Sequence, residues 1–240
     1  MRQWELMEPV PILQDDDNEV APVEGNAVIP VGDRYLCWVD CKNGFFLCDM
    51  ADEARPKVRY VPVPAEVSRC CSSDDHDDYD DKDLFPLKYT KKMGAAGASR
   101  VRFVSIDPHC CCGGPGRSTC AHSHFAFTVR TWTMDLNMDD KPLAWVKDGE
   151  MDCEEVWALL GYEGLPRANL LCPVVSLDNP NVVCFLVSHR RLNKNEDLKV
   201  WMIQLNMKSK TLLSVVQLTG ASRAFDHLPA ELQYKPENTR

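Results

Sequence analysis

The part of the sequence best suited to chemistry is a short segment rich in cysteine and histidine. It runs from His109 through Cys110-Cys-Cys112 to Cys120, His122 and His124. Thiolate and imidazole groups are ligands that zinc prefers, and a tetrahedral zinc site needs four of them. The segment 109–124 therefore predicts one specific metal site. Its four ligands would be Cys110, Cys112, Cys120 and His122, with His124 as an alternative to His122.

The spacing of these ligands also supports a second interpretation, in which the segment is an ordinary loop. It holds no Cys-x-x-Cys pair, and adjacent cysteines rarely ligate one ion well. The run Gly113-Gly-Pro-Gly116 is typical of a turn. We therefore expect residues 107–123 to form a mobile loop and expect no cofactor, with zinc as the alternative.

Other patterns that could support ion binding or catalysis are incomplete. The acidic stretch Ser72–Asp83 lacks the central glycine and the terminal glutamate of an EF-hand calcium loop. The stretch Gly113–Thr119 lacks the Lys-Ser/Thr ending of a phosphate-binding loop. No Gly-x-Ser-x-Gly nucleophile motif occurs. We therefore predict that the protein is not an enzyme.

Charge and hydropathy restrict the location and the partners of the chain. The acidic stretch, with seven Asp and one Lys, supplies −6 of the net charge of −9, and no segment has the clustered Lys and Arg of a nucleic-acid footprint. No apolar run approaches the ~20 residues of a membrane span. The start of the chain, Met1–Met7, lacks the apolar core of a signal peptide. We therefore expect a cytoplasmic or nuclear protein with reduced thiols, without nucleic-acid or membrane partners.

Hairpin patterns that each carry a tryptophan in the first strand predict the fold. They occur at 35–49, 125–146 and 200–218, and the second hairpin returns through a strand at 143–146. Each joins an apolar strand, a polar turn and a returning strand, which indicates antiparallel sheets. We predict an all-β fold of antiparallel blade-like meanders. The arrangement would be partly propeller-like, with a β-sandwich as the alternative.

Proline and charge content predict one β domain with flanking segments. The domain is expected to span residues 27–220. Residues 1–26, with three prolines and an acidic run, would form an extended lead-in, and residues 221–240 a polar tail. Charge repulsion and missing apolar residues predict a further mobile loop at 65–99.

One short helix is predicted inside the β domain, over residues 153–160. Asp152 can cap its first turn and Glu155 can complete a capping box. Its apolar face would be formed by Val156, Trp157 and Leu160. Because an uncovered sheet edge invites aggregation, we expect this helix to cover an open end or edge of the sheets.

The tryptophans allow two interpretations. Since they lie at strand or helix positions flanked by apolar residues, core packing is the main prediction, and an aromatic ligand surface is the alternative. The residues concerned are Trp38, Trp132, Trp145, Trp157 and Trp201.

An ordered set of short motifs resembles a known plant family. The motifs include Tyr35-Leu-Cys-Trp-Val-Asp40, Gly44-Phe-Phe-Leu-Cys-Asp49, Val58-Arg-Tyr-Val-Pro-Val-Pro64 and Pro173-Val-Val-Ser176. Between about Val28 and Leu218 the chain is similar to the domain of unknown function 1618, a family expanded in grasses. The resemblance brings no catalytic residues with it. Because some relatives resemble F-box-associated proteins, it implies substrate recognition for ubiquitin ligases.

Together these patterns predict a non-catalytic protein-binding module whose partner and oligomeric state stay open. The alternative is a zinc-binding protein that uses the segment 109–124.

Overall fold

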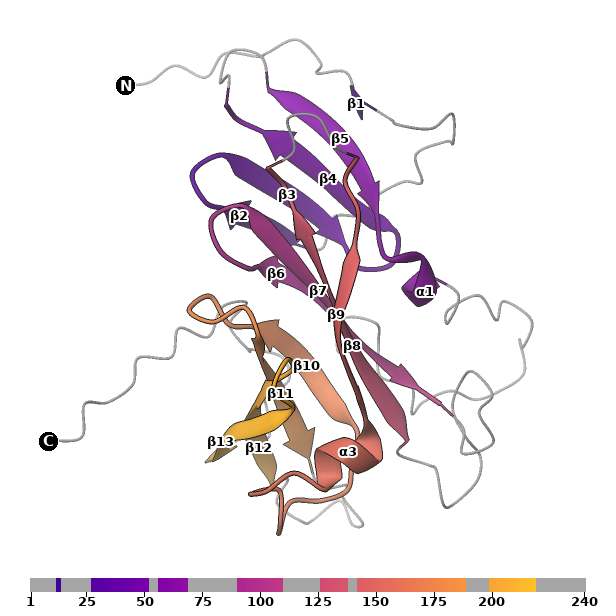
Figure 1. Ribbon diagram of the computed structural model, residues 1–240, viewed down its shortest axis with the longest axis vertical. Coiled ribbons are helices and arrows are strands. Elements are labelled where there is room, and N and C mark those ends of the chain that lie inside the picture. Colours follow the sequence, from indigo (N-terminus) through magenta and orange to yellow (C-terminus); the bar gives the residue numbers. More distant parts are fainter. Residues whose placement is uncertain are drawn as a thin grey trace, which may run out of the picture.

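Three β-sheets follow one another along the chain, each formed by strands that are consecutive in sequence apart from one short addition. The computed structural model describes residues 12–13, 27–51, 56–68, 90–109, 126–137, 142–188 and 199–218. Figure 1 shows the sheets fanned out, with the second sheet between the first and the third. The sheets are called sheet 1, sheet 2 and sheet 3 in chain order.

Sheet 1 has the strand order β1-β5-β4-β3-β2. Its strands are β1 (Ile12–Leu13), β2 (Ala27–Val31), β3 (Tyr35–Asp40), β4 (Gly44–Asp49) and β5 (Lys57–Pro62). Strand β1 pairs in parallel with β5, and the other strands pair antiparallel. The short helix α1 (Ala65–Ser68) follows β5.

Sheet 2 has the strand order β6-β7-β8-β9, and all its pairings are antiparallel. Its strands are β6 (Lys91–Ala95), β7 (Arg100–Pro108), β8 (Phe127–Asp135) and β9 (Val146–Asp152). Strand β6 lies inside the stretch 65–99, so the loop prediction is wrong for residues 91–95. The return strand β9 begins at Val146, where the sequence predicted that it would end.

Sheet 3 has the strand order β10-β11-β12-β13, again with antiparallel pairing throughout. Its strands are β10 (Leu170–Val175), β11 (Val182–Ser188), β12 (Val200–Asn206) and β13 (Thr211–Leu218). Strand β13 is the edge strand farthest from β10.

Two large hydrophobic cores lie between successive sheets. The core between sheets 1 and 2 includes Phe45, Leu47, Phe103 and Trp132. The core between sheets 2 and 3 includes Ile106, Val129, Phe185, Ile203 and Leu205. Sheet 2 therefore buries apolar side chains on both of its faces, whereas sheets 1 and 3 each use one face for this packing.

The first long strands of the three sheets lie next to one another: β2 lies beside β6, and β6 beside β10. Glycines permit this close approach. A Cβ atom on Gly94 of β6 would lie 2.8 Å from the Val175 Cβ of β10. In the turn after β2, Gly32 has a φ of +57°, and its Cβ would lie 2.2 Å from the Ala98 backbone oxygen. Only glycine fits either position without displacing a neighbouring strand or turn.

The prediction of an all-β fold built from antiparallel meanders is confirmed. Each sheet starts at its innermost long strand and proceeds outward, which is the blade-like arrangement. Within the part of the chain that the structure describes, the three sheets do not close into a barrel or a ring. Neither helix among those residues is long and apolar enough to cross a membrane.

The inserted helix, α3 (Cys153–Trp157), starts where the sequence predicted and ends earlier. The capping box is present: the Asp152 side chain accepts from the Glu154 backbone N–H at 3.0 Å, and Glu155 Oε2 accepts from the Asp152 N–H at 3.0 Å. Val156 is buried in the core between sheets 2 and 3, and Trp157 packs against it. Leu160 is 89% exposed, so its predicted place on an apolar helix face is wrong.

Candidate functional site

The face of sheet 2 that points toward sheet 1 changes from apolar to polar along its strands. Where sheet 1 covers it, Phe103 of β7 and Trp132 of β8 form an apolar cross-strand pair. Two residues farther along, Ser105 is opposite Arg130, and Arg130 is opposite Glu150 of β9. Because side chains two residues apart in a strand point to the same side, one face is half apolar and half polar.

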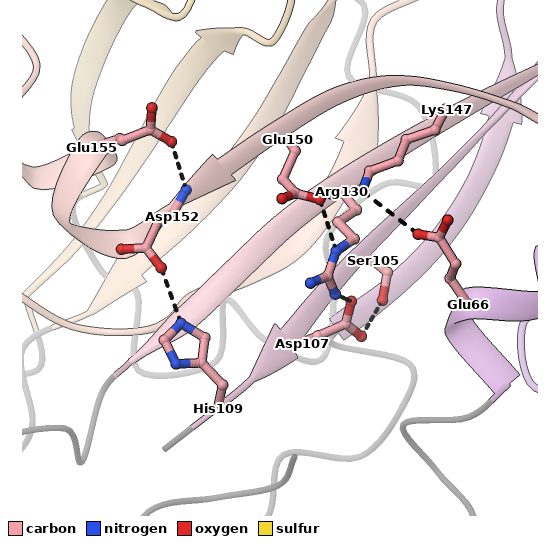
Figure 2. A network of polar contacts seen from close by, with 9 residues as sticks. All are labelled: Glu66, Ser105, Asp107, His109, Arg130, Lys147, Glu150, Asp152 and Glu155. Atoms are coloured by element: carbon pink, nitrogen blue, oxygen red, sulfur yellow. Dashed lines mark hydrogen bonds and ion pairs between the residues drawn. The ribbon is translucent and has the colours of Figure 1, made fainter. Parts of the chain in front are cut away.

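The polar half of this face forms a connected charged network (Figure 2). It consists of Glu66 of α1 with Ser105, Asp107, Arg130, Lys147 and Glu150 of sheet 2. The Ser105 hydroxyl donates to Asp107 at 2.6 Å, and the Arg130 guanidinium donates to Asp107 at 2.9 Å and to Glu150 at 3.0 Å. Lys147 forms ion pairs with Glu150 and, at 3.5 Å, with Glu66.

Neighbours of opposite charge stabilise the charged forms of Glu150 and Arg130 in the network. The hydrogen bond from Lys147 and that from Arg130 hold the pKa of Glu150 below its usual value, against the effect of burial. Burial opposes the charged form of Arg130, but Glu150 and Asp107 outweigh it and raise its pKa. Three carboxylates and two basic groups give the network a formal charge of −1, and each of these groups already contacts a group of opposite charge.

A second polar cluster lies on the opposite face of sheet 2. Arg102 is 2% exposed; its guanidinium donates to Thr133 at 3.3 Å and forms an ion pair with Asp148. The hydroxyls of Thr131 and Thr133 donate to Asp148 at 2.7 Å and 2.6 Å. Asp148 thus supplies the counter-charge that a buried arginine requires, while the Arg102 Nη1 atom is buried without a hydrogen-bond partner.

A third cluster joins the end of β7 to the start of α3 (Figure 2). The His109 Nε2 atom lies 3.0 Å from Asp152 Oδ2, and the Cys153 thiol donates to Asp152 Oδ1 at 3.5 Å. The potential ligand atoms of the three residues lie within 4.8 Å of one another. Burial opposes ionisation of Asp152, but hydrogen bonds from Glu154 and His109 outweigh it and lower its pKa. Burial raises the pKa of the Cys153 thiol.

The third cluster contains the first residue of the predicted zinc segment. His109 is described and lies beside Asp152 and Cys153. The four ligands predicted from the sequence, Cys110, Cys112, Cys120 and His122, lie outside the described residues. Sequence reasoning missed Asp152 and Cys153 as neighbours of His109, because it assigned them only to the start of a helix.

Several described thiols sit in surroundings that favour the protonated form. Burial raises the pKa of Cys37 to about 12, and it also raises the pKa of Cys41 and Cys184. A thiol with a raised pKa is a poor nucleophile and a poor metal ligand at neutral pH. These cysteines therefore act as small apolar residues that pack in or against the core.

The outer face of sheet 1, which points away from sheet 2, carries a row of large apolar side chains across four strands. Val28 is opposite Trp38, Trp38 is opposite Phe46, and Phe46 is opposite Tyr60. Val28 is 55% exposed and Trp38 36% exposed, while Phe46 and Tyr60 are half-buried and meet edge to face. For Trp38 the prediction of core packing is wrong. The apolar neighbours that suggested it, Cys37 and Val39, point to the other face.

The remaining strand positions of this outer face are also uncharged, apart from Asp40 at one end. Asp40 is buried and accepts hydrogen bonds from the Lys42 backbone and from Asn43 at 2.8 Å each. The second row across the face consists of Pro30, Leu36, Cys48 and Val58. A wide apolar surface with an exposed tryptophan is typical of a protein interaction site.

Comparison with known proteins identifies a family and nothing closer. No curated protein and no solved structure matches the chain. One family matches residues 38–184, from Trp38 in sheet 1 to Cys184 in sheet 3, so the match includes sheet 2 and parts of both other sheets. The chain belongs to the family described as a protein of unknown function (DUF1618).

Proposed function

We propose that the protein is a non-catalytic protein-binding module and that the outer face of sheet 1 is its contact surface. The observation that carries this proposal is the exposure of Trp38 within an uncharged row that crosses four strands. Tryptophan and tyrosine dominate the binding energy of protein interfaces, because they bury a large area at a small cost in conformational entropy.

The charged network on sheet 2 is a weaker candidate for the contact surface. Its ions already pair with one another, so a partner would have to break existing contacts before making new ones. On the outer face of sheet 1, a partner would displace only water from apolar side chains. The hydrophobic effect favours that exchange by roughly 25 cal/mol per Å².

The chemical state of the described thiols supports a non-catalytic role. Their pKa values are raised by burial, so they offer little thiolate at neutral pH. In the charged network the Ser105 hydroxyl donates to the carboxylate of Asp107, which is itself held by Arg130. The substrate recognition for ubiquitin ligases that the family resemblance implies stays a prediction.

Affinity capture with matched surface variants tests this proposal. The tagged wild-type protein, Trp38→Glu and Leu160→Glu would be captured from an extract of cells that express the protein. Leu160 is the control, because it is 89% exposed and lies outside the outer face of sheet 1. Proteins retained by the wild type and by Leu160→Glu but lost with Trp38→Glu would support the proposal. Equal retention by all three would contradict it.

Zinc binding is a second candidate function, and the third cluster favours it. His109, the first residue of the segment rich in cysteine and histidine, meets a carboxylate and a thiol from another part of the chain. Zinc is bound by nitrogen, oxygen and sulfur ligands at about 2.0–2.3 Å. The separations within the cluster are compatible with His109, Asp152 and Cys153 as ligands of one ion after small side-chain movements. Zinc would have to displace the proton of the Cys153 thiol, whose pKa burial raises.

Metal analysis of the purified full-length chain tests the second candidate. The wild type is expected to bind about one zinc ion per chain after dialysis against buffer with trace zinc, and Cys153→Ser much less. Cys184→Ser is the control, since Cys184 is buried in sheet 3 away from the cluster. A wild type without zinc, or equal zinc in all three proteins, would contradict this function.

A further inference from the structure

The outer edges of the three sheets differ in how they are protected. An edge strand presents N–H and C=O groups without partners, so proteins cover such edges or place charges on them. In sheet 1 the outer edge of β5 is covered by the short strand β1, which lies parallel to it with Ile12 opposite Val58 and Leu13 opposite Arg59. The outer edge strand is β9 in sheet 2 and β13 in sheet 3 (Figure 1).

The outer edge of sheet 2 is protected by charge. Strand β9 has the sequence Val146-Lys-Asp-Gly-Glu-Met-Asp152, in which four of seven residues are charged. Lys147 and Glu150 are exposed and form an ion pair, and a further strand that paired with β9 would have to desolvate them. Sheets 1 and 2 thus use the two common means of protecting an edge, which are an added strand and charged side chains.

Strand β13 has neither form of protection among the residues that the structure describes. Its sequence, Thr211-Leu-Leu-Ser-Val-Val-Gln-Leu218, contains no charge and no proline over eight residues. It pairs with β12 on one side, and no described strand pairs with it on the other. Every second residue of such a strand directs its N–H and C=O away from the sheet. Strand β13 therefore offers a row of hydrogen-bonding groups to an added strand.

Apolar side chains are exposed on both sides of β13. Val215 is opposite Ile203, which is fully buried in the core between sheets 2 and 3, yet Val215 itself is 37% exposed. Val216 is opposite Met202 on the other side of the sheet and is 42% exposed. Neighbouring side chains of a strand point to opposite faces. An added strand would therefore cover both valines only if it carried apolar residues at neighbouring positions.

From these observations we infer that β13 binds an extended peptide segment of a partner protein as a fifth strand of sheet 3. The pairing segment is Ser214–Leu218, because a register shift lies just before it and its own pairing with β12 is regular. Strand β1 is an example within the chain: an Ile-Leu pair adds to the outer edge of a meander of the same kind. The ligand is therefore an uncharged extended segment with consecutive apolar residues. This surface is separate from the outer face of sheet 1 and does not depend on the proposed function.

Binding of a synthetic peptide to the purified full chain is the first part of the test. The probe is a fluorescein-labelled peptide, Lys-Lys-Thr-Val-Ile-Leu-Val-Thr, whose lysines keep it soluble. The control peptide has the same sequence with an N-methyl group on each apolar residue, which keeps the side chains and removes the backbone donors. By fluorescence anisotropy we expect saturable binding of the probe and at least about tenfold weaker binding of the control, since main-chain hydrogen bonds supply the affinity of strand addition.

Charges placed on two different edges are the second part of the test. Val215→Lys is expected to weaken binding of the probe by at least about tenfold, because it puts a charge on the pairing edge. Val146→Lys is the matched control, since Val146 is 62% exposed on β9, the outer edge of sheet 2. This control and Trp38→Glu should both bind the probe like the wild type. Circular dichroism would check that each variant keeps the fold.

Hydrogen exchange of the wild type locates the peptide on the chain. With the probe bound, the amides of β13 should exchange more slowly, whereas those of β9 and β5 should be unchanged. This measurement needs no substitution, so it holds even if a variant fails to fold.

The outcomes either support or overturn the inference. Saturable binding that N-methylation and Val215→Lys both weaken, with slower exchange in β13, supports it. A probe that does not bind, or that binds the wild type and Val215→Lys equally, overturns it. A wild-type dimer in sedimentation that Val215→Lys dissociates would place a second copy on this edge and would also overturn it. Loss of the probe with Trp38→Glu alone would assign the peptide to the outer face of sheet 1, so the inference would fail while the proposed function stands.

Discussion

Two surfaces of the protein that no described sheet covers differ in the polarity of the side chains that they expose to water. The charged network on sheet 2 satisfies its own ions, with Asp107, Arg130 and Glu150 linked in one chain of contacts. The outer face of sheet 1 has apolar side chains instead, including Trp38 and Val28, which remain exposed. The first surface gains little from a partner, whereas the second gains from any partner that removes it from water.

The comparison shows that exposure alone does not identify a contact surface. Glu66 and Glu150 are as exposed as Trp38 or more so, yet their charges are well hydrated and already paired. What distinguishes the outer face of sheet 1 is the continuity of its apolar row across four strands. Single exposed apolar residues are normal, but a contiguous patch indicates a binding site.

The largest expected effect on stability distinguishes a tryptophan in the core from a tryptophan on the outer face of sheet 1. Trp132 is 3% exposed in the core between sheets 1 and 2, so Trp132→Ala should lower the free energy of unfolding by about 3–5 kcal/mol. For Trp38→Ala, measured under conditions where the protein is monomeric, we expect about 1 kcal/mol or less. Denaturant titration of both variants checks this. Equal losses would show that Trp38 is a core residue and would remove the basis of the comparison.

The next effect compares a buried ion pair with the exposed network. Removing the Asp148 carboxylate leaves the charge of Arg102, which is 2% exposed, without its partner. Asp148→Ala should therefore lower the free energy of unfolding by about 3 kcal/mol, measured by denaturant titration. The double variant Arg102→Met/Asp148→Ala should recover part of this loss. A single variant as stable as the wild type would show that Arg102 is hydrated.

The same carboxylate predicts a dependence of stability on pH. Burial raises the pKa of Asp148, but hydrogen bonds from Thr133, Thr131 and Arg102 outweigh this and lower it overall. The contribution of Asp148 to the free energy of unfolding is therefore fully present above the pKa of about 4 that this group has in the unfolded chain. It is lost as the pH falls through the lower pKa of the folded state. Between about pH 5 and pH 3, Asp148→Asn should lose less stability than the wild type. Parallel losses in denaturant titrations at each pH would argue against a lowered pKa.

The smallest effect is expected in the charged network itself. Glu150→Gln removes the ion pairs with Arg130 and Lys147, but these groups are partly exposed and the surrounding water screens them. We expect a loss of at most about 1 kcal/mol, which should shrink further in about 1 M salt. Thermal unfolding at low and high salt checks this. A loss that persists at high salt would mean that the network contributes more to the fold than its exposure suggests.

Much of the fold could be predicted because local patterns determine it. The alternation in β3 places Tyr35, Cys37 and Val39 in the core and Leu36 and Trp38 on the outer face, as strand geometry requires. Asp152 followed by Glu155 identified the start of α3, because capping depends on residues close in sequence.

Strand β6 could not be predicted in this way. Its sequence, Lys91-Lys-Met-Gly-Ala95, has few residues with a preference for strands. Tertiary contacts determine its conformation instead: it pairs with β7, and Gly94 allows it to approach Val175 of β10. Long-range packing of this kind leaves no signal in a short window of sequence.

The candidate sites depend on register, which the sequence left undetermined. His109 meets Asp152 because β7, β8 and β9 place Asp107 opposite Thr128, and Thr128 opposite Asp152. The charged network arises from the same register, two residues from the apolar pair of Phe103 and Trp132. A shift of one residue would move every one of these side chains to the other face.

The most direct test of the proposed contact surface is photo-crosslinking from the outer face of sheet 1. A benzophenone amino acid would replace Phe46, which lies in the row with Trp38 and Tyr60, and a second protein would carry it at Leu160 as the control. In an extract of cells that express the chain, we predict cross-links from position 46 to a partner protein, identified by mass spectrometry. Position 46 giving no more cross-links to other proteins than position 160 would contradict the account.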